Sequence, residues 1–225
     1  MKRSLKVEQK LSTSAKPRRT VQRSAAGELL QRIGQTPLLS LSRLERIGSG
    51  VRLFAKAEWC NPGGSVKDRA AASIIADAEA SGRLPAPRGA RQAGLRDGVA
   101  LLDATSGNTG VAYAMIAAAK GYRATLCVPK NANPEVLELL RSYGAEVIAT
   151  DPLQGSDGAI REARRLAAEF PGRFVYLVQY NNPANWTAHY RTTGLEIWEQ
   201  TGGAVTHFVA GLGTTGTFTG TARRL

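Results

Sequence analysis

Lys67 stands near the end of a glycine-rich turn whose sequence, from residue 61 to residue 69, is Asn-Pro-Gly-Gly-Ser-Val-Lys-Asp-Arg. A strand-like run at residues 51–59 precedes the turn, and a helical pattern at residues 69–80 follows it. The two glycines allow a backbone path that a Cβ atom would hinder. The pattern predicts a bend that directs one amine inward, toward a reactive ligand. The alternative is a solvated lysine that begins a helix, because Lys is seldom buried.

Two further turns rich in Gly, Ser and Thr also follow strand-like runs. Residues 105–110 (Thr-Ser-Gly-Asn-Thr-Gly) succeed the apolar run 99–104 and open a helix of small residues at 111–120. Residues 211–217 (Gly-Leu-Gly-Thr-Thr-Gly-Thr) follow the run 206–210. Both turns place free backbone N–H groups at a helix N-terminus, where the helix dipole favours an anion such as a phosphate or a carboxylate. Taken singly, each turn could equally be an ordinary connection in an open α/β sheet.

Five segments together resemble the cysteine synthases. They are residues 61–69, 105–110, 179–185 (Gln-Tyr-Asn-Asn-Pro-Ala-Asn), 193–198 (Thr-Gly-Leu-Glu-Ile-Trp) and 213–217. This is the O-acetylserine sulfhydrylase family of fold-type II enzymes that depend on pyridoxal 5'-phosphate, to which cystathionine β-synthase also belongs. The likeness runs from about residue 33 to the last residue, in the order and spacing of the family.

The resemblance implies a role for each turn. Lys67 would form the imine with the cofactor aldehyde and, once released, remove the α-proton of the substrate, which requires a lowered amine pKa. The residues that match the phosphate-binding loop of the family are Gly213, Thr214, Thr215, Gly216 and Thr217. Asn108 matches the residue that hydrogen-bonds the 3′ oxygen of the cofactor ring. The residues that match the loop gripping the substrate α-carboxylate are Thr105, Ser106, Gly107 and Thr109, with Gln179 completing this site from the other domain.

The resemblance also implies a reaction, the β-replacement of O-acetyl-L-serine or O-phosphoserine with sulfide or thiosulfate to give L-cysteine. The Gly-Thr-Thr-Gly-Thr loop resembles the B-type enzymes, whereas A-type enzymes usually have a glycine at the position of Thr215. This difference suggests tolerance of sulfur donors larger than sulfide. A β-replacement like that of cystathionine β-synthase is an alternative, and a homodimer is implied by the resemblance alone.

Strand-like and helical patterns alternate along the chain with short links, which predicts an α/β fold with mainly parallel strands. By resemblance, the fold has two open, mainly parallel sheets covered by helices, as in the β subunit of tryptophan synthase. The expected organisation is a basic flexible tail at 1–27, a larger cofactor domain formed by 28–45 and 152–225, and a smaller substrate-loop domain at 46–151. Because family members continue well beyond this length, the larger domain is expected to be incomplete. A non-catalytic relative that acts through subunit interactions is therefore a second functional hypothesis.

Composition excludes several other classes of protein. The net charge of the 225 residues is +12, but eight basic residues and the single acid Glu8 give residues 1–23 a charge of +7, so the remainder does not indicate nucleic-acid binding. This tail is typical of a disordered arm, with an organelle transit peptide as the alternative. No apolar run approaches the ~20 residues of a membrane span. Two cysteines and two histidines argue against a disulfide framework or a metal site, and favour the cytoplasm.

A dinucleotide-binding enzyme is a further alternative, because Gly211, Gly213 and Gly216 satisfy the G-x-G-x-x-G fingerprint after a strand-like run. The acidic residue that would confirm this fingerprint is expected ~20 residues further on, beyond Leu225. Three threonines in the loop favour a terminal phosphate over a pyrophosphate. Lys67 would have no role in such an enzyme.

Overall fold

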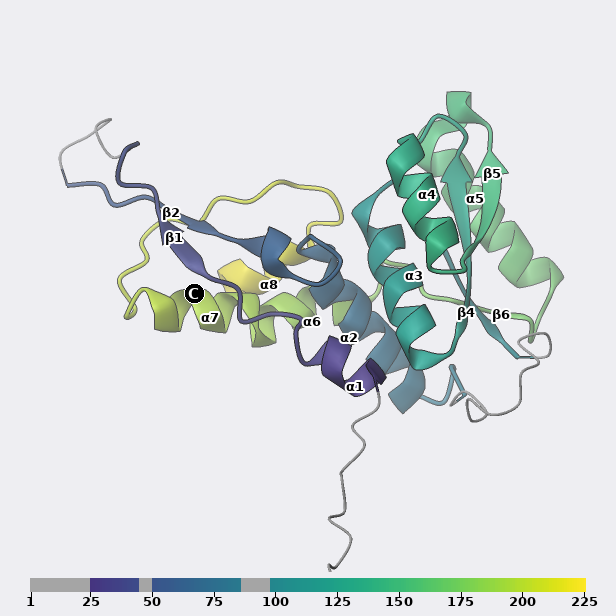
Figure 1. Cartoon of the computed structure of the whole chain (residues 1–225), viewed down its shortest axis with the longest axis horizontal. Helices are drawn as coiled ribbons and strands as arrows, with labels where there is room; N and C mark the ends of the chain where they lie inside the picture. Colours follow the sequence, from purple (N-terminus) through teal and green to yellow (C-terminus); the bar gives the residue numbers. More distant parts are fainter. Residues whose placement is uncertain (1–24, 45–49, 86–97) are drawn as a thin grey trace, which may run out of the picture.

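The computed structural model describes residues 25–44, 50–85 and 98–225, so nearly all of the predicted basic tail lies outside the described residues. The molecule is elongated, with a parallel sheet and its helices in one half and a group of helices with a short antiparallel sheet in the other (Figure 1). Both halves contribute to the cavity described below.

One half is built on a four-stranded parallel sheet with the strand order β5-β4-β3-β6. Its strands are β3 (Ala100–Ala104), β4 (Arg123–Pro129), β5 (Glu146–Thr150) and β6 (Phe174–Tyr176). Its covering helices are α3 (Asn108–Lys120), α4 (Pro134–Ser142) and α5 (Gly155–Glu169), the last preceded by the short helix η3 (Pro152–Gln154). The predicted α/β class is confirmed.

Side chains that alternate along each strand form two separate apolar cores. Leu101 and Leu126 pack with α3 and α4 on one face, whereas Leu102 and Cys127 pack with α5 on the other. The connection from β3 therefore leaves along one face, and the connection that leads into β6 crosses the opposite face. In open α/β sheets, ligands bind outside the carboxyl ends of the strands where the direction of winding changes. Here that place lies between the ends of β3 and β6.

The other half consists mainly of helices. They are α1 (Ala25–Leu30), α2 (Lys67–Ala80), α6 (Pro183–Arg191), α7 (Thr193–Gln200) and α8 (Gly216–Arg224), with the short helix η2 (Glu58–Cys60). Two short strands, β1 (Leu38–Ser40) and β2 (Phe54–Lys56), pair antiparallel. Helix α2 packs against both α3 and α6 and so joins the halves, while α8 lies along α6 and α7.

The predicted second sheet differs from the arrangement observed. Residues 204–212, which include the strand-like run 206–210, form no helix or strand, and Val209 is 91% exposed. The strand expected at residues 51–59 is reduced to β2, whose partner is antiparallel. A strand requires a neighbour to pair its backbone N–H and C=O groups, and among the described residues none pairs with this run.

The domain boundary predicted at residue 151 stays a prediction. Two elements that follow it, α5 and β6, pack with the sheet that precedes it. Strand β6 pairs with β3 in the parallel sheet, and α5 covers that sheet. Both had been assigned to the larger domain. Of the residues after 151, the helices α6, α7 and α8 pack in the other half of the molecule, together with β1 from the expected segment 28–45.

Candidate active site

The bend before α2 is closed by Asp68. The N–H of Gly63 donates to Asp68 Oδ2 at 2.5 Å, and Ser65 Oγ accepts from the N–H of Lys67 at 3.2 Å. A Cβ atom on Gly63 would lie 2.4 Å from Asp68 Oδ1, and Gly64 has a φ of +76°. Both positions therefore favour glycine, because the first has no room for a side chain and the second has left-handed backbone. The bend fixes Lys67 as the first residue of α2.

Lys67 is half-buried, and burial lowers the pKa of its amine from the usual value. The cause is desolvation, which disfavours the charged ammonium. A lowered pKa is what the predicted role as imine-forming residue and base requires. It increases the neutral, nucleophilic fraction of the amine at neutral pH.

An ion-pair network that the sequence reasoning did not identify holds the start of α2. The buried Arg69 guanidinium bonds Glu58 at 2.8 Å and Glu196 at 2.6 Å, and Lys56 Nζ bonds Glu196 at 2.6 Å. Burial opposes ionisation of Glu196, but hydrogen bonds from Arg69 and Lys56 outweigh it and lower the pKa of Glu196 to about 2. The network links α7 and η2 to Arg69, which lies two positions after Lys67 in α2. Glu196 lies in the segment 193–198 that resembles the cysteine synthases. This resemblance is the one feature of the sequence that pointed to the residue.

The turn after β3 folds around the side chain of Thr105. Its Oγ1 accepts from the N–H groups of Gly107 at 3.2 Å and Gly110 at 3.0 Å. A Cβ atom on Gly110 would lie 2.4 Å from Thr105 Cγ2, so the turn packs closely on this residue. The Thr105 hydroxyl therefore shapes the loop, whereas Ser106 and Asn108 are exposed at the N-terminus of α3.

The turn after β6 places Gln179 against the end of β3. Its N–H donates to Asp103 Oδ2 at 3.1 Å, and its Nε2 donates to the carbonyl oxygen of Ala104 at 2.7 Å. Burial raises the pKa of the Asp103 carboxyl to about 7. Val178 has a φ of +56°, which is strained for a β-branched residue. Such strain is concentrated at functional sites, where surrounding contacts maintain it.

The turn before α8 packs on two buried side chains of α6. Thr214 Oγ1 accepts from Asn185 Nδ2 at 3.0 Å, and Thr217 Oγ1 lies 3.3 Å from Nε2 of His189. Burial is the largest cause that lowers the pKa of His189 to about 4, so its imidazole is neutral at physiological pH. Thr215 has a φ of +63° and is the second strained β-branched residue of the site. Neither buried side chain was predicted.

One cavity of about 230 Å³ brings most of the predicted residues together. Predicted residues in its lining are Lys67, Thr105, Ser106, Gly107, Asn108, Thr109, Gln179, Gly213 and Thr214. Thr215, Gly216 and Thr217 follow at the N-terminus of α8 but are not part of the lining. Lining residues that were not predicted are Ala104, Ser156, Ile160 and Tyr180. The cavity lies at the carboxyl ends of β3 and β6, as the winding of the sheet favours.

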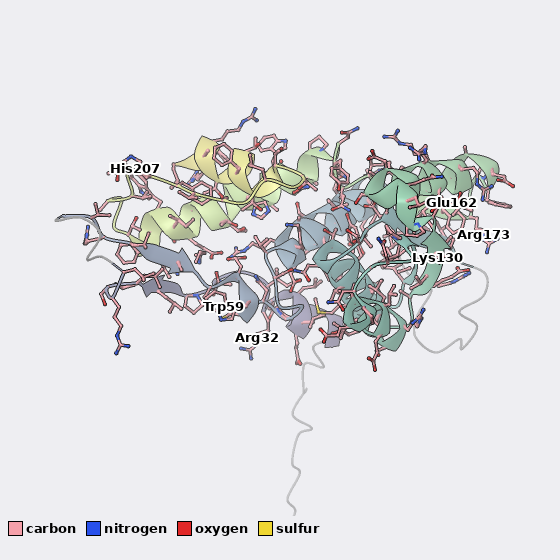
Figure 2. All side chains as sticks on the ribbon, turned by 90° about the horizontal axis from the view of Figure 1, so that it is seen from above. Arg32, Trp59, Lys130, Glu162, Arg173 and His207 are labelled. Atoms are coloured by element: carbon pink, nitrogen blue, oxygen red, sulfur yellow. The ribbon has the colours of Figure 1, made fainter. Side chains whose placement is uncertain are left out.

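Other kinds of site find no support in the described part of the chain. It contains no group of three or more His, Cys, Asp or Glu side chains arranged to hold a metal ion. His189 is buried, whereas His207 is exposed toward the end of the helical half (Figure 2). None of the described helices is long and apolar enough to cross a membrane. The dinucleotide fingerprint requires a strand before Gly211, and residues 204–212 form none.

Residues 29–225 match the pattern of the pyridoxal-phosphate dependent enzymes, and the chain belongs to this family. The cysteine synthase of Aquifex aeolicus is 47% identical to it over 205 residues, which cover 90% of this chain and 59% of the relative. Cysteine synthase B of Escherichia coli is 48% identical over 195 residues, which cover 87% and 60%. The crystal structure of the cysteine synthase of Entamoeba histolytica is similar with a TM-score of 0.78 at 35% identity, over 96% of this chain and 60% of that one. The resemblance to cysteine synthases is confirmed, and the chain spans about 60% of the length of these relatives.

Family membership implies pyridoxal phosphate as the cofactor, and the residues of the cavity fit its functional groups. The cofactor carries an aldehyde, which needs an amine, and a phosphate, which needs N–H and O–H donors. Lys67 supplies the amine with a lowered pKa, and Thr214 lines the same cavity next to the first turn of α8. The first N–H groups of a helix have no partner within the helix and suit an anion. The donor set therefore matches the cofactor.

Proposed function

We propose that the chain forms the cofactor- and substrate-binding part of a cysteine synthase. The reaction would exchange the ester oxygen on Cβ of O-acetyl-L-serine or O-phosphoserine for sulfur, and sulfide would give L-cysteine directly. The observation that carries this proposal is that one cavity joins Lys67, the turn at 105–109, Gln179 and the Gly213–Thr214 turn. The similarity to a cysteine synthase and a cysteine synthase B supports the same reaction.

Lys67 would have two tasks. Its Nζ would hold the cofactor and, once released, accept the α-proton of the bound amino acid. Because burial lowers the pKa of Lys67, more of the amine is neutral and able to accept a proton at neutral pH. When bound, the cofactor supplies the electron sink that makes this α-proton acidic.

The turn before α8 would bind the phosphate. Its backbone N–H groups at Gly213, Thr215 and Gly216 would donate together with the hydroxyls of Thr214 and Thr217. The dipole of α8 adds a favourable potential for the anion at this end of the helix. Asn108, which lines the same cavity, would donate to the 3′ oxygen of the cofactor ring.

The turn after β3 would bind the α-carboxylate of the substrate. The N–H groups of Ser106 and Thr109 lie at the N-terminus of α3, where a carboxylate is favoured, with Gly107 between them as the residue before the helix. Thr105 would act by shaping this turn, because its hydroxyl already accepts two loop N–H groups. Gln179 donates one amide hydrogen to Ala104, and its second remains for the substrate. Ile160 and Tyr180 would help to exclude water.

Assembly, domains and location are further parts of the proposal. A homodimer with the domain division given above fits the family. Cytoplasmic location fits the two cysteines, both of which are free in the structure. Cys60 is exposed, whereas Cys127 is buried, and burial raises the pKa of its thiol to about 12.

The test is an assay of the purified 225-residue chain with pyridoxal phosphate and each serine ester. Adding sulfide should give L-cysteine, and thiosulfate in place of sulfide tests the B-type resemblance. Lys67→Ala should abolish product, whereas the exposed Lys130→Ala should not change it. A chain that binds the cofactor without turnover would favour the non-catalytic alternative, and one that does not bind the cofactor would refute the proposal.

A further inference from the structure

Asn185 joins two of the turns that line the cavity. It is 6% exposed, and its side-chain nitrogen donates to the carbonyl oxygen of Gln179 at 2.8 Å and to Thr214 Oγ1 at 3.0 Å. Gln179 follows β6 and Thr214 precedes α8, so the two partners come from separate parts of the chain. A side-chain amide has two hydrogens, and both are used here.

The strained residues of the site are immediate neighbours of these two partners. Val178, with a φ of +56°, precedes Gln179, and Thr215, with a φ of +63°, follows Thr214. Each such conformation is unfavourable and persists only where surrounding contacts determine it. A Cβ atom on Gly216 would lie 2.0 Å from Asn185 Oδ1, so the turn also packs directly on this side chain. Asn185 is thus in contact with both strained turns.

The hydrogen bond to Thr214 also sets the direction of its hydroxyl. Because the oxygen accepts from Asn185, the hydroxyl hydrogen is left to donate to another acceptor. Thr214 lines the cavity, so an anion bound there would be able to accept this hydrogen. A hydroxyl oriented in advance loses less entropy when it binds a ligand.

We propose that Asn185 is a positioning residue for the phosphate of the cofactor, which holds the two strained turns together and orients the Thr214 hydroxyl toward the phosphate. This inference rests on the proposed function, because it takes the anion to be the phosphate of pyridoxal phosphate. Asn185 does not itself line the cavity, and it acts through Thr214 and the backbone of Gln179.

The experiment measures the affinity of the 225-residue chain for pyridoxal phosphate by absorbance titration, and for inorganic phosphate by thermal shift. Asn185→Ala and Thr214→Val should each weaken binding about tenfold, the effect of one lost hydrogen bond to a charged group. The double variant should also lose only about tenfold, because both changes remove the same oriented hydroxyl. Asn185→Asp keeps the shape but cannot donate, and its charge opposes the anion, so about a hundredfold loss is expected.

Asn133→Ala is the matched control. Asn133 caps α4 by accepting from the N–H of Glu135 at 2.8 Å and contacts neither strained turn, so its loss should lower the melting temperature and leave phosphate affinity unchanged. If the losses of affinity of the two single variants multiply in the double variant, or if Asn185→Asp has wild-type affinity, the role of Asn185 is wrong. The proposed function would not be affected by either result. A wild-type chain that binds neither probe would overturn both this role and the proposed function.

Discussion

Glu196→Gln tests the network that holds the start of α2. Glu196 accepts from the guanidinium of Arg69, from Lys56 and from the N–H of Gln35. The glutamine side chain keeps the shape but removes the charge and half of the acceptor capacity. Arg69, whose side chain is 2% exposed, would then keep Glu58 as its charged partner in this network.

The stability that Glu196→Gln should lose can be derived in two ways. Breaking a buried ion pair by removing one partner costs about 3–5 kcal/mol. The pKa of Glu196, lowered to about 2 from 4.5, corresponds to about 3 kcal/mol of stability in favour of the ionised form. We therefore expect Glu196→Gln to lower the free energy of unfolding by about 3 kcal/mol at pH 7, or the melting temperature by about 6–12 °C.

The pH dependence follows from the direction of the shift. The folded pKa lies below the unfolded value of 4.5, so the contribution is complete above pH 4.5 and is lost as the pH falls toward 2. The difference between wild type and Glu196→Gln should shrink to about 1.4 kcal/mol at pH 3. Urea unfolding at both pH values measures it, with the exposed Glu199→Gln on the same helix as the control, for which less than about 0.5 kcal/mol is expected. A loss below about 1 kcal/mol, or one that is equal at both pH values, would refute the reasoning.

Three further predictions concern the backbone and the buried histidine. Gly63→Ala places a Cβ atom 2.4 Å from Asp68 Oδ1 and should weaken cofactor binding, which is measured by titration. Gly64→Ala meets no atom within 4 Å, so it should cost about 1 kcal/mol of stability through its positive φ alone. Thr215→Gly should raise the free energy of unfolding by up to about 1 kcal/mol in denaturant titrations, because glycine relieves the strain at a φ of +63°. A marked loss of stability would show that this conformation is not strained. His189 has its pKa lowered to about 4, so the unfolded chain binds a proton between pH 6.5 and 4 that the folded chain does not, and stability should fall with decreasing pH by about 1.4 kcal/mol per unit in that range. His189→Gln should remove this component from pH-dependent unfolding curves, and an unchanged slope would contradict the assignment.

Elements with local signals could be predicted from the sequence. Asn133 caps α4 by accepting from the N–H of Glu135 at 2.8 Å, Pro134 is the first helical residue, and Gly144 has a φ of +77° shortly after the helix. The run 206–210 was wrongly predicted as a strand, because apolar β-branched residues indicate strand propensity but not whether a neighbouring strand is present. Pairing is a tertiary property that a local pattern does not contain.

The candidate site shows the same division. The three turns at residues 61–69, 105–110 and 211–217 were predicted because glycine and hydroxyl residues mark them locally. All three contribute to the cavity lining, the first through Lys67. Asn185 and His189 were missed because they act through Thr214 and Thr217, which lie 29 and 28 positions away along the chain. Asn185 lies in the segment 179–185 that resembles the cysteine synthases, but nothing local to either residue indicates such a contact.

The most direct test of the central claim is to identify the lysine that holds the cofactor. The purified chain is incubated with pyridoxal phosphate, reduced with borohydride and digested, and the modified peptide is located by mass spectrometry. We predict that the phosphopyridoxyl group is on Lys67, and that neither Lys67→Ala nor a chain left without borohydride carries it. Modification of a different lysine, or of surface lysines without preference, would contradict the account.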